Sequence, residues 1–168
     1  MNLNQTIKLV SEINQNDLDK LSYLVKNAEQ ILLIGNGGSN AISSHIAVDY
    51  NKFLKKKSLA FSDPPMITAY MNDYGVDQAY LNYIHNMSDD NTLVILISSS
   101  GNSRNIYNAA EHCKNNNIKF ILLTGFNFDN LVRRNFQKFA ELDYWIDSQS
   151  YGVVECVHQI FLHSIIDN

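Results

Sequence analysis

Short runs of consecutive apolar residues, each followed by a turn rich in glycine or serine, constrain the fold of this chain most strongly. One run occupies residues 31–34 and leads into the turn Gly35-Asn36-Gly37-Gly38-Ser39. Another occupies residues 93–97, within the segment NTLVILI at 91–97, and leads into the turn SSSGNS at residues 98–103. Unbroken apolar runs of this length are typical of strands buried on both faces of a sheet. A helical pattern follows each turn, so the sequence predicts repeated units of strand, turn and helix.

The same alternation extends over most of the chain. We expect strands over residues 31–34, 58–61, 91–97, 119–123 and 143–146, and helices over residues 39–53, 77–87, 104–114 and 151–166. Ser39 is expected near the first N-cap, and Pro64-Pro65 predicts a loop. Residues 1–28 have the apolar spacing of two short helices. Strands alternating with helices imply right-handed βαβ units. The expected fold class is α/β, a three-layer αβα sandwich with a mostly parallel five-stranded sheet.

The length and composition fit one globular domain. The chain has 168 residues, of which 45% are hydrophobic and 18% are charged. This is enough for one sizeable core and a polar surface. We therefore expect a single domain over residues 1–168, with a helical segment at 1–28 and an α/β core at 29–168.

Charge and hydropathy exclude several classes of function. The formal net charge is −4, and a protein that binds nucleic acid through the phosphate backbone needs a basic face. No apolar stretch approaches the length of a membrane helix, and the first residues lack the features of a signal peptide. We expect a cytoplasmic protein that binds neither nucleic acid nor membrane. The two cysteines, Cys113 and Cys156, argue against a disulfide framework or a zinc ribbon.

Both turns are candidate anion sites. Glycine allows close approach to the backbone, and a helix N-terminus offers free N–H groups with a partial positive charge. The first turn lacks the last glycine of the dinucleotide fingerprint, and neither turn contains a Walker motif. The four hydroxyls of the second turn could satisfy phosphate oxygens without a cationic side chain. The recurrence of two such turns at equivalent positions favours a phosphate over an ordinary serine-rich turn.

Titratable side chains gather on the two helices expected after the first turn and at the end of the chain. His45 and Asp49 are four residues apart and share one face of the first helix. Glu155, His158 and His163 lie among apolar residues of the last helix. Carboxylates and imidazoles suit proton transfer and zinc binding, provided that the two helices meet.

Taken together, these motifs resemble the sugar isomerase (SIS) domain and, more closely, the phosphoheptose isomerases. The motifs are GNGGS with a downstream histidine, MNDYG, SSSGNS, LLTG and a terminal helix with a histidine, and they cover residues 31–168 in the family's order. The resemblance implies the SIS fold, which is flavodoxin-like or Rossmann-like. It also implies a homo-oligomer, with a tetramer favoured and a dimer as the alternative.

The resemblance also assigns roles to individual residues. In that family the serine loop binds the sugar phosphate, which implies a substrate site formed by Asn36, Ser39, Asp73, Ser98, Ser99, Ser100, Ser103 and Glu155. The family's catalytic and zinc-binding group aligns with His45, Asp49, Glu155 and His163, which implies one Zn²⁺ per site. Asp49 would be the base and His163 its acid/base partner.

The implied reaction is an aldose–ketose isomerisation through an enediol. It converts sedoheptulose 7-phosphate to D-glycero-D-manno-heptose 7-phosphate, for the synthesis of lipopolysaccharide or capsule heptose. Such a reaction needs a base, an acid and a group that stabilises the oxyanion, and a divalent metal can polarise the carbonyl.

The chain departs from the family pattern at several positions. Asp49 replaces a glutamate, Glu155 replaces a glutamine, Gly152 replaces an aspartate, and residues 125–150 differ in sequence and length. Two alternatives follow from these differences. The protein is an isomerase of a different sugar phosphate, or it is a non-catalytic SIS protein of the kind that binds the replication initiator DnaA.

Overall fold

The core of the molecule is one parallel β-sheet. In this computed structural model, which describes residues 2–166, five strands pair in the order β2-β1-β3-β4-β5, and every neighbouring pair is parallel. The strands are β1 (Gln30–Gly35), β2 (Lys57–Ala60), β3 (Thr92–Ser98), β4 (Lys119–Thr124) and β5 (Leu142–Trp145). This order is that of a flavodoxin-like doubly wound sheet. The predicted fold class is confirmed.

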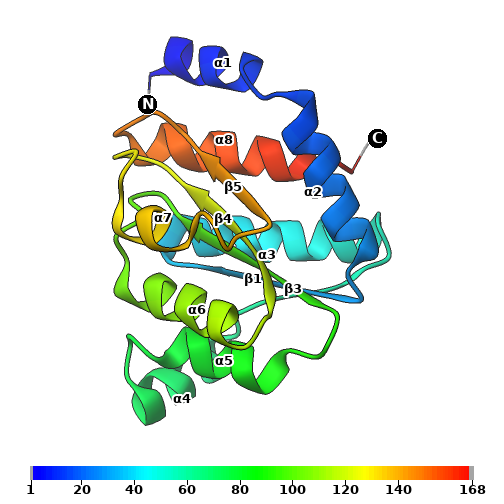
Figure 1. Cartoon of the computed structure of the whole chain (residues 1–168), viewed down its shortest axis with the longest axis vertical. Coiled ribbons are helices and arrows are strands. Elements are labelled where there is room, and N and C mark those ends of the chain that lie inside the picture. The colour runs from blue at the N-terminus through cyan, green and yellow to red at the C-terminus, as the bar shows by residue number, and fades with distance from the viewer. Residues whose placement is uncertain (1, 167–168) are drawn as a thin grey trace.

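Helices cover both faces of this sheet (Figure 1). One face packs against α2 (Gln15–Asn27), α3 (Gly37–Lys52) and α8 (Tyr151–His163). The other face packs against α5 (Ala79–Met87), α6 (Arg104–Asn115) and α7 (Leu131–Phe136), with α4 (Pro64–Tyr74) beside α5. Helix α1 (Leu3–Ser11) lies on the outer side of α8, so residues 1–28 contain the two predicted helices.

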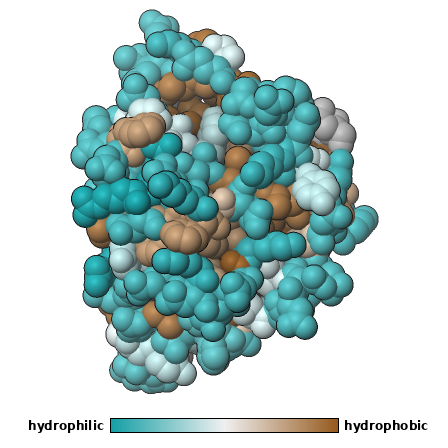
Figure 2. Space-filling model, viewed as in Figure 1, coloured by the Kyte–Doolittle hydropathy of each residue, from teal (hydrophilic) through white to brown (hydrophobic). Residues whose placement is uncertain are grey.

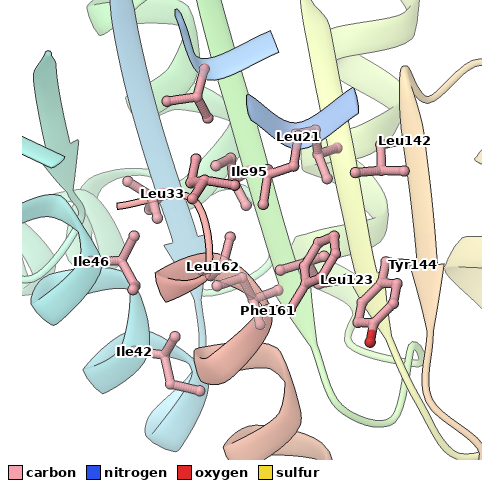
Figure 3. Close-up of a cluster of buried hydrophobic side chains, with 14 of the residues drawn as sticks. Leu21, Leu33, Ile42, Ile46, Ile95, Leu123, Leu142, Tyr144, Phe161 and Leu162 are labelled. Carbon is pink, nitrogen blue, oxygen red and sulfur yellow. The ribbon is translucent and has the colours of Figure 1, made fainter. Parts of the chain in front are cut away.

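Successive residues of the central strands supply the two halves of the core. On β1, Ile31 and Leu33 pack toward α3 and α8, whereas Leu32 and Ile34 pack toward α5 and α6. Figure 3 shows the first of these clusters, in which Leu33 lies beside residues of α3 and α8. Burying each large aliphatic side chain contributes about 1.5–3 kcal/mol. The unbroken apolar runs of the sequence therefore reflect burial on both faces of the sheet.

The outer surface is largely polar. The face drawn in Figure 2 is mostly hydrophilic, with small hydrophobic areas between the polar side chains. None of the helices within residues 2–166 has the length and hydropathy needed to cross a membrane.

Two local expectations were wrong. Pro64 and Pro65 do not form a loop but begin α4, where Asp63 caps the helix by accepting a hydrogen bond from the N–H of Met66 at 3.1 Å. Proline fits this position because the first N–H groups of a helix have no partner within the helix. The N-cap of α3 is Asn36 rather than Ser39, which is the third residue of that helix. Helix α7 was not predicted, the boundaries of the other predicted helices and strands differ from prediction by a few residues, and α8 ends at His163.

Candidate functional site

A hollow of about 330 Å³ opens at the carboxyl edge of the sheet, where β1 and β3 end. Its walls come from the turn before α3, the serine turn after β3 and the first two turns of α8. Seven of the residues predicted to bind substrate line it, namely Asn36, Ser39, Ser98, Ser99, Ser100, Ser103 and Glu155. The structure therefore brings both glycine-serine turns together, as their positions after neighbouring parallel strands require.

The glycine turn shapes one wall of the hollow. Gly37 begins α3 with a φ of 52°, in the left-handed region that glycine adopts without strain. At Gly38 a β-carbon would collide with the carboxylate of Glu155, so the missing side chain leaves room for that carboxylate against α3. The carboxylate of Glu155 thus lies over the start of α3, where the first N–H groups are unpaired within the helix and carry a partial positive charge.

The side chain of Asn36 connects this turn to the rest of the domain. It exchanges two hydrogen bonds with the amide of Asn105, at 2.9 and 3.0 Å, and its Oδ1 also accepts one from Tyr80 Oη at 2.8 Å. Asn105 is buried at the start of α6. These contacts hold the first turn against the second, so the structure gives Asn36 a positioning role within the hollow.

The serine turn forms the opposite wall. Gly101 has a φ of 62°, and the N–H of Asn102 donates to Ser100 Oγ at 3.2 Å. Ser98 Oγ donates to Ser103 Oγ at 3.4 Å. Within residues 2–166 the buried hydroxyl of Ser99 has no hydrogen-bond partner. The turn therefore offers a dense group of hydroxyls at the point where α6 begins.

The hollow contains a single charged side chain among the described residues that line it, namely Glu155. Burial raises the pKa of the Glu155 carboxyl above its ordinary value. An anion in this hollow would be held by hydroxyls, backbone N–H groups and the N-termini of α3 and α6, without a lysine or arginine.

A second cluster joins α3 and α8 farther along their length. His163 Nε2 lies 3.1 Å from Asp49 Oδ2, and His45 Nε2 lies 3.4 Å from the same oxygen. The two imidazole rings meet edge to face with their centroids 5.0 Å apart. The Asp49 side chain is only 16% exposed, whereas that of His45 is 52% exposed. Three of the four predicted catalytic and metal-binding residues are therefore together.

The three donors of this cluster fit a metal ion. One ligand atom from each of His45, Asp49 and His163 lies within 4.8 Å of the others. Two imidazole nitrogens and one carboxylate oxygen form a donor set that Zn²⁺ accepts, with a coordination position left for a substrate. Glu155 is not in this cluster. It lies eight residues before His163, about 12 Å along α8, and lines the hollow instead.

Asp73, which was predicted to bind substrate, and His158, which was not, both lie outside the hollow. Asp73 lies in the last turn of α4, exposed, where its carboxylate accepts a hydrogen bond from Asn72 Nδ2 at 2.9 Å. His158 is fully buried, and its Nε2 lies 3.1 Å from the carbonyl oxygen of Thr124. Burial lowers the pKa of His158 to about 4. This histidine is therefore a neutral core residue.

Sequence reasoning missed Tyr151, which also lines the hollow. Its position four residues before Glu155 places it on the same side of α8. The spacing from Glu155 could have indicated Tyr151 as a lining residue. Only the structure shows that α8 begins beside the serine turn, which brings Tyr151 to the hollow.

Comparisons with known proteins agree with this geometry. The family model of the SIS domain matches residues 24–150. Phosphoheptose isomerase of Aliarcobacter butzleri is 30% identical over 177 residues, covering 98% of this chain and 91% of the relative. That of Thermodesulfovibrio yellowstonii is 31% identical over 142 residues, covering 81% and 69% respectively. The chain belongs to the phosphoheptose isomerase family of SIS-domain proteins, as the sequence resemblance implies.

Solved structures show the same fold. Phosphoheptose isomerase GmhA from Neisseria gonorrhoeae superimposes with a TM-score of 0.85 at 22% identity, covering 96% of this chain and 90% of that one. The Vibrio vulnificus NanR protein complexed with ManNAc-6P gives a TM-score of 0.70 at 17% identity, covering 98% and 58%.

Proposed function

We propose that this protein is a phosphoheptose isomerase, which converts sedoheptulose 7-phosphate to D-glycero-D-manno-heptose 7-phosphate. The product would supply the synthesis of lipopolysaccharide or capsule heptose. The observation that carries the proposal is that one pair of helices, α3 and α8, borders the serine hollow and also holds the His45–Asp49–His163 cluster. Membership of the phosphoheptose isomerase family supports it.

The hollow would hold the phosphate group. The hydroxyls of Ser98, Ser99, Ser100 and Ser103 would donate to its oxygens, together with the N–H groups at the start of α3 near Ser39. The buried Ser99 hydroxyl supports this assignment, because a buried hydroxyl without a partner gains from a ligand oxygen.

The separation between the hollow and the cluster fits a long sugar phosphate. From Ser39 to His45 is six residues of α3, or about 9 Å of helix. Asp49 lies four residues farther, so a substrate with its phosphate in the hollow would have to extend along α3 for its carbonyl end to approach the cluster. A long sugar phosphate suits this separation better than a short one.

Asp49 and His163 would move the protons. In the isomerisation a base removes a proton from one carbon of the sugar, and the oxygens exchange a proton as the enediol forms and collapses. Asp49 would be the base, and its Oδ2 faces the imidazole of His163 at 3.1 Å. His163 would carry the proton between the two sugar oxygens.

Zinc fits the same cluster, with His45, Asp49 and His163 as its ligands. When bound, Zn²⁺ would polarise the sugar carbonyl and favour formation of the enediol. Asp49 would help to hold the metal through Oδ2, which faces both imidazoles. Glu155, in the hollow, would contact the substrate.

We also propose that the protein is a homo-oligomer in the cytoplasm, with a tetramer favoured over a dimer. Exposed apolar side chains beside the cluster, Val48 of α3 and Ile160 of α8, support association of copies through this surface. Burying such side chains between subunits would exclude water from the reacting groups.

The direct test is to incubate the purified protein with sedoheptulose 7-phosphate, with and without added Zn²⁺, and to follow proton exchange and aldose formation by NMR. Conversion that depends on Zn²⁺ would support the proposal. A folded protein that binds the sugar phosphate but exchanges no proton in either condition would contradict it. Screening ketose phosphates of five to seven carbons, and a pull-down with DnaA, would then separate the two alternatives.

A further inference from the structure

The wall that α8 contributes to the hollow carries an aromatic ring. Tyr151 is the first residue of α8 and lines the hollow together with Glu155, one turn further along the same helix. The side chain of Tyr151 is 59% exposed, although it stands beside the buried serine turn. Its ring and hydroxyl are thus available to a molecule that occupies the hollow.

The ring of Tyr151 is held in place from behind by Phe126. The two rings meet edge to face, with centroids 4.8 Å apart and an angle of 66° between their planes. Phe126 has a φ of 54°, a left-handed conformation that is rare for a bulky residue. Its N–H donates to the carbonyl oxygen of Ser148 at 3.0 Å, just before α8 begins. Backbone strain of this kind persists only where the surrounding structure enforces it.

We propose that Tyr151 is a substrate-contacting residue that recognises the carbon chain of the sugar rather than its phosphate. The inference rests on the proposed function, since it assigns a second contact in the same site. A tyrosine suits a sugar, because its ring can cover C–H groups while its hydroxyl bonds to sugar hydroxyls, and few torsions are lost on binding.

The position of Tyr151 explains why it contacts the sugar. The phosphate oxygens are served by the serine turn and by the start of α3, whereas Tyr151 stands on α8. The following turns of that helix carry Glu155 and then His163, which belongs to the second cluster. Tyr151 lies twelve residues before His163, about 18 Å along α8, and lines the hollow itself. It would therefore contact the sugar carbons next to the phosphate and not the carbonyl end.

The test compares two ligands, sedoheptulose 7-phosphate and inorganic phosphate, by isothermal titration calorimetry of the full chain. Tyr151→Ala is expected to weaken binding of the sugar phosphate about tenfold and to leave inorganic phosphate unchanged. Tyr151→Phe keeps the ring and loses the hydroxyl, so its effect should be smaller. Phe126→Ala, which frees the ring, should reproduce the Tyr151→Ala pattern. Tyr23→Ala is the matched control, because Tyr23 lies on α2 and is 67% exposed.

The ratio of the affinities for sedoheptulose 7-phosphate and inorganic phosphate decides whether Tyr151 contacts the sugar. Equal weakening for both ligands would assign Tyr151 to the phosphate or to the fold, and no weakening for either would remove it from the site. A wild-type protein that binds the sugar phosphate no more tightly than inorganic phosphate would also overturn the inference. Turnover is measured separately. A protein that binds the sugar phosphate without isomerising it contradicts the proposed function, whereas the affinity ratio still decides the role of Tyr151.

Discussion

Replacing Asp49 by asparagine tests the proposed chemistry most directly. The substitution keeps the size of the side chain and removes its charge and its capacity to accept a proton. In the structure Asp49 Oδ2 lies 3.1 Å from His163 Nε2 and 3.4 Å from His45 Nε2. Asparagine would therefore change the chemistry of the cluster with little change in its packing.

The expected loss is large for turnover and small for binding. A positioned general base contributes about 10²–10⁴-fold, so kcat should fall by about that factor. Binding of the sugar phosphate should change little, because Asp49 lies ten residues beyond Ser39, about 15 Å along α3 from the hollow. The free energy of unfolding should change by less than about 1 kcal/mol, since both imidazoles are partly exposed and solvent screens these pairs.

The assay measures conversion of sedoheptulose 7-phosphate and deuterium uptake from D₂O by NMR, together with the dissociation constant of the same ligand. Asp90→Asn is the control, because Asp90 is an exposed aspartate that belongs neither to the lining of the hollow nor to the His45–Asp49–His163 cluster. If Asp49→Asn retains turnover within tenfold of the wild type, the assignment of Asp49 as base is refuted. If Asp49→Asn loses both turnover and binding of the sugar phosphate, the serine hollow and the His45–Asp49–His163 cluster do not have separate roles.

Three further substitutions test the packing around the site and the phosphate contacts of the serine turn. Burial lowers the pKa of His158 to about 4, whereas an unfolded histidine titrates near 6.5. The stability that neutral His158 contributes is therefore complete above pH 6.5, and about 3 kcal/mol of it is lost as the pH falls to 4. Urea unfolding of His158→Gln should show a shallower dependence on pH in that window. Gly101→Ala should destabilise the fold by about 2 kcal/mol or more and abolish phosphate binding, because φ is positive and a β-carbon would collide with the amide of Asn130. Thermal unfolding and calorimetry measure the two effects. Ser103→Ala should raise KM about tenfold with little change in kcat, which steady-state kinetics would show.

The sheet and most helices could be predicted because their signals are local. Residues 93–97 form an apolar run, and the structure buries all of Thr92–Ser98. Helix α4 was missed because Pro64-Pro65 has two interpretations. A proline pair can interrupt a helix or begin one, and here Asp63, as the N-cap residue, makes the pair the start of α4.

The two halves of the site differ in how far the sequence could define them. The serine turn was predictable because its hydroxyls are consecutive and its strand ends at the carboxyl edge of the sheet. The sequence could not show that Glu155 and His163, on the same helix, contact different residues. The spacing of eight residues gives a distance along α8, but only the packing of α3 shows that His163 meets Asp49 while Glu155 lies over Gly38.

The meeting of Asp49 and His163 depends on their immediate neighbours. Tyr50 Oη donates to the carbonyl oxygen of Leu162 at 3.0 Å, and both residues are fully buried. Burial raises the pKa of the Tyr50 hydroxyl far above its ordinary value, so this group remains a donor throughout the working pH range. The bond joins α3 and α8 one residue from each reacting group. Proton transfer between two side chains fails when their atoms are misplaced by about 1 Å, so the spacing of the helices that carry them must be fixed. The buried hydrogen bond beside the pair fixes that spacing, whereas the two imidazoles are partly exposed and would not fix it alone.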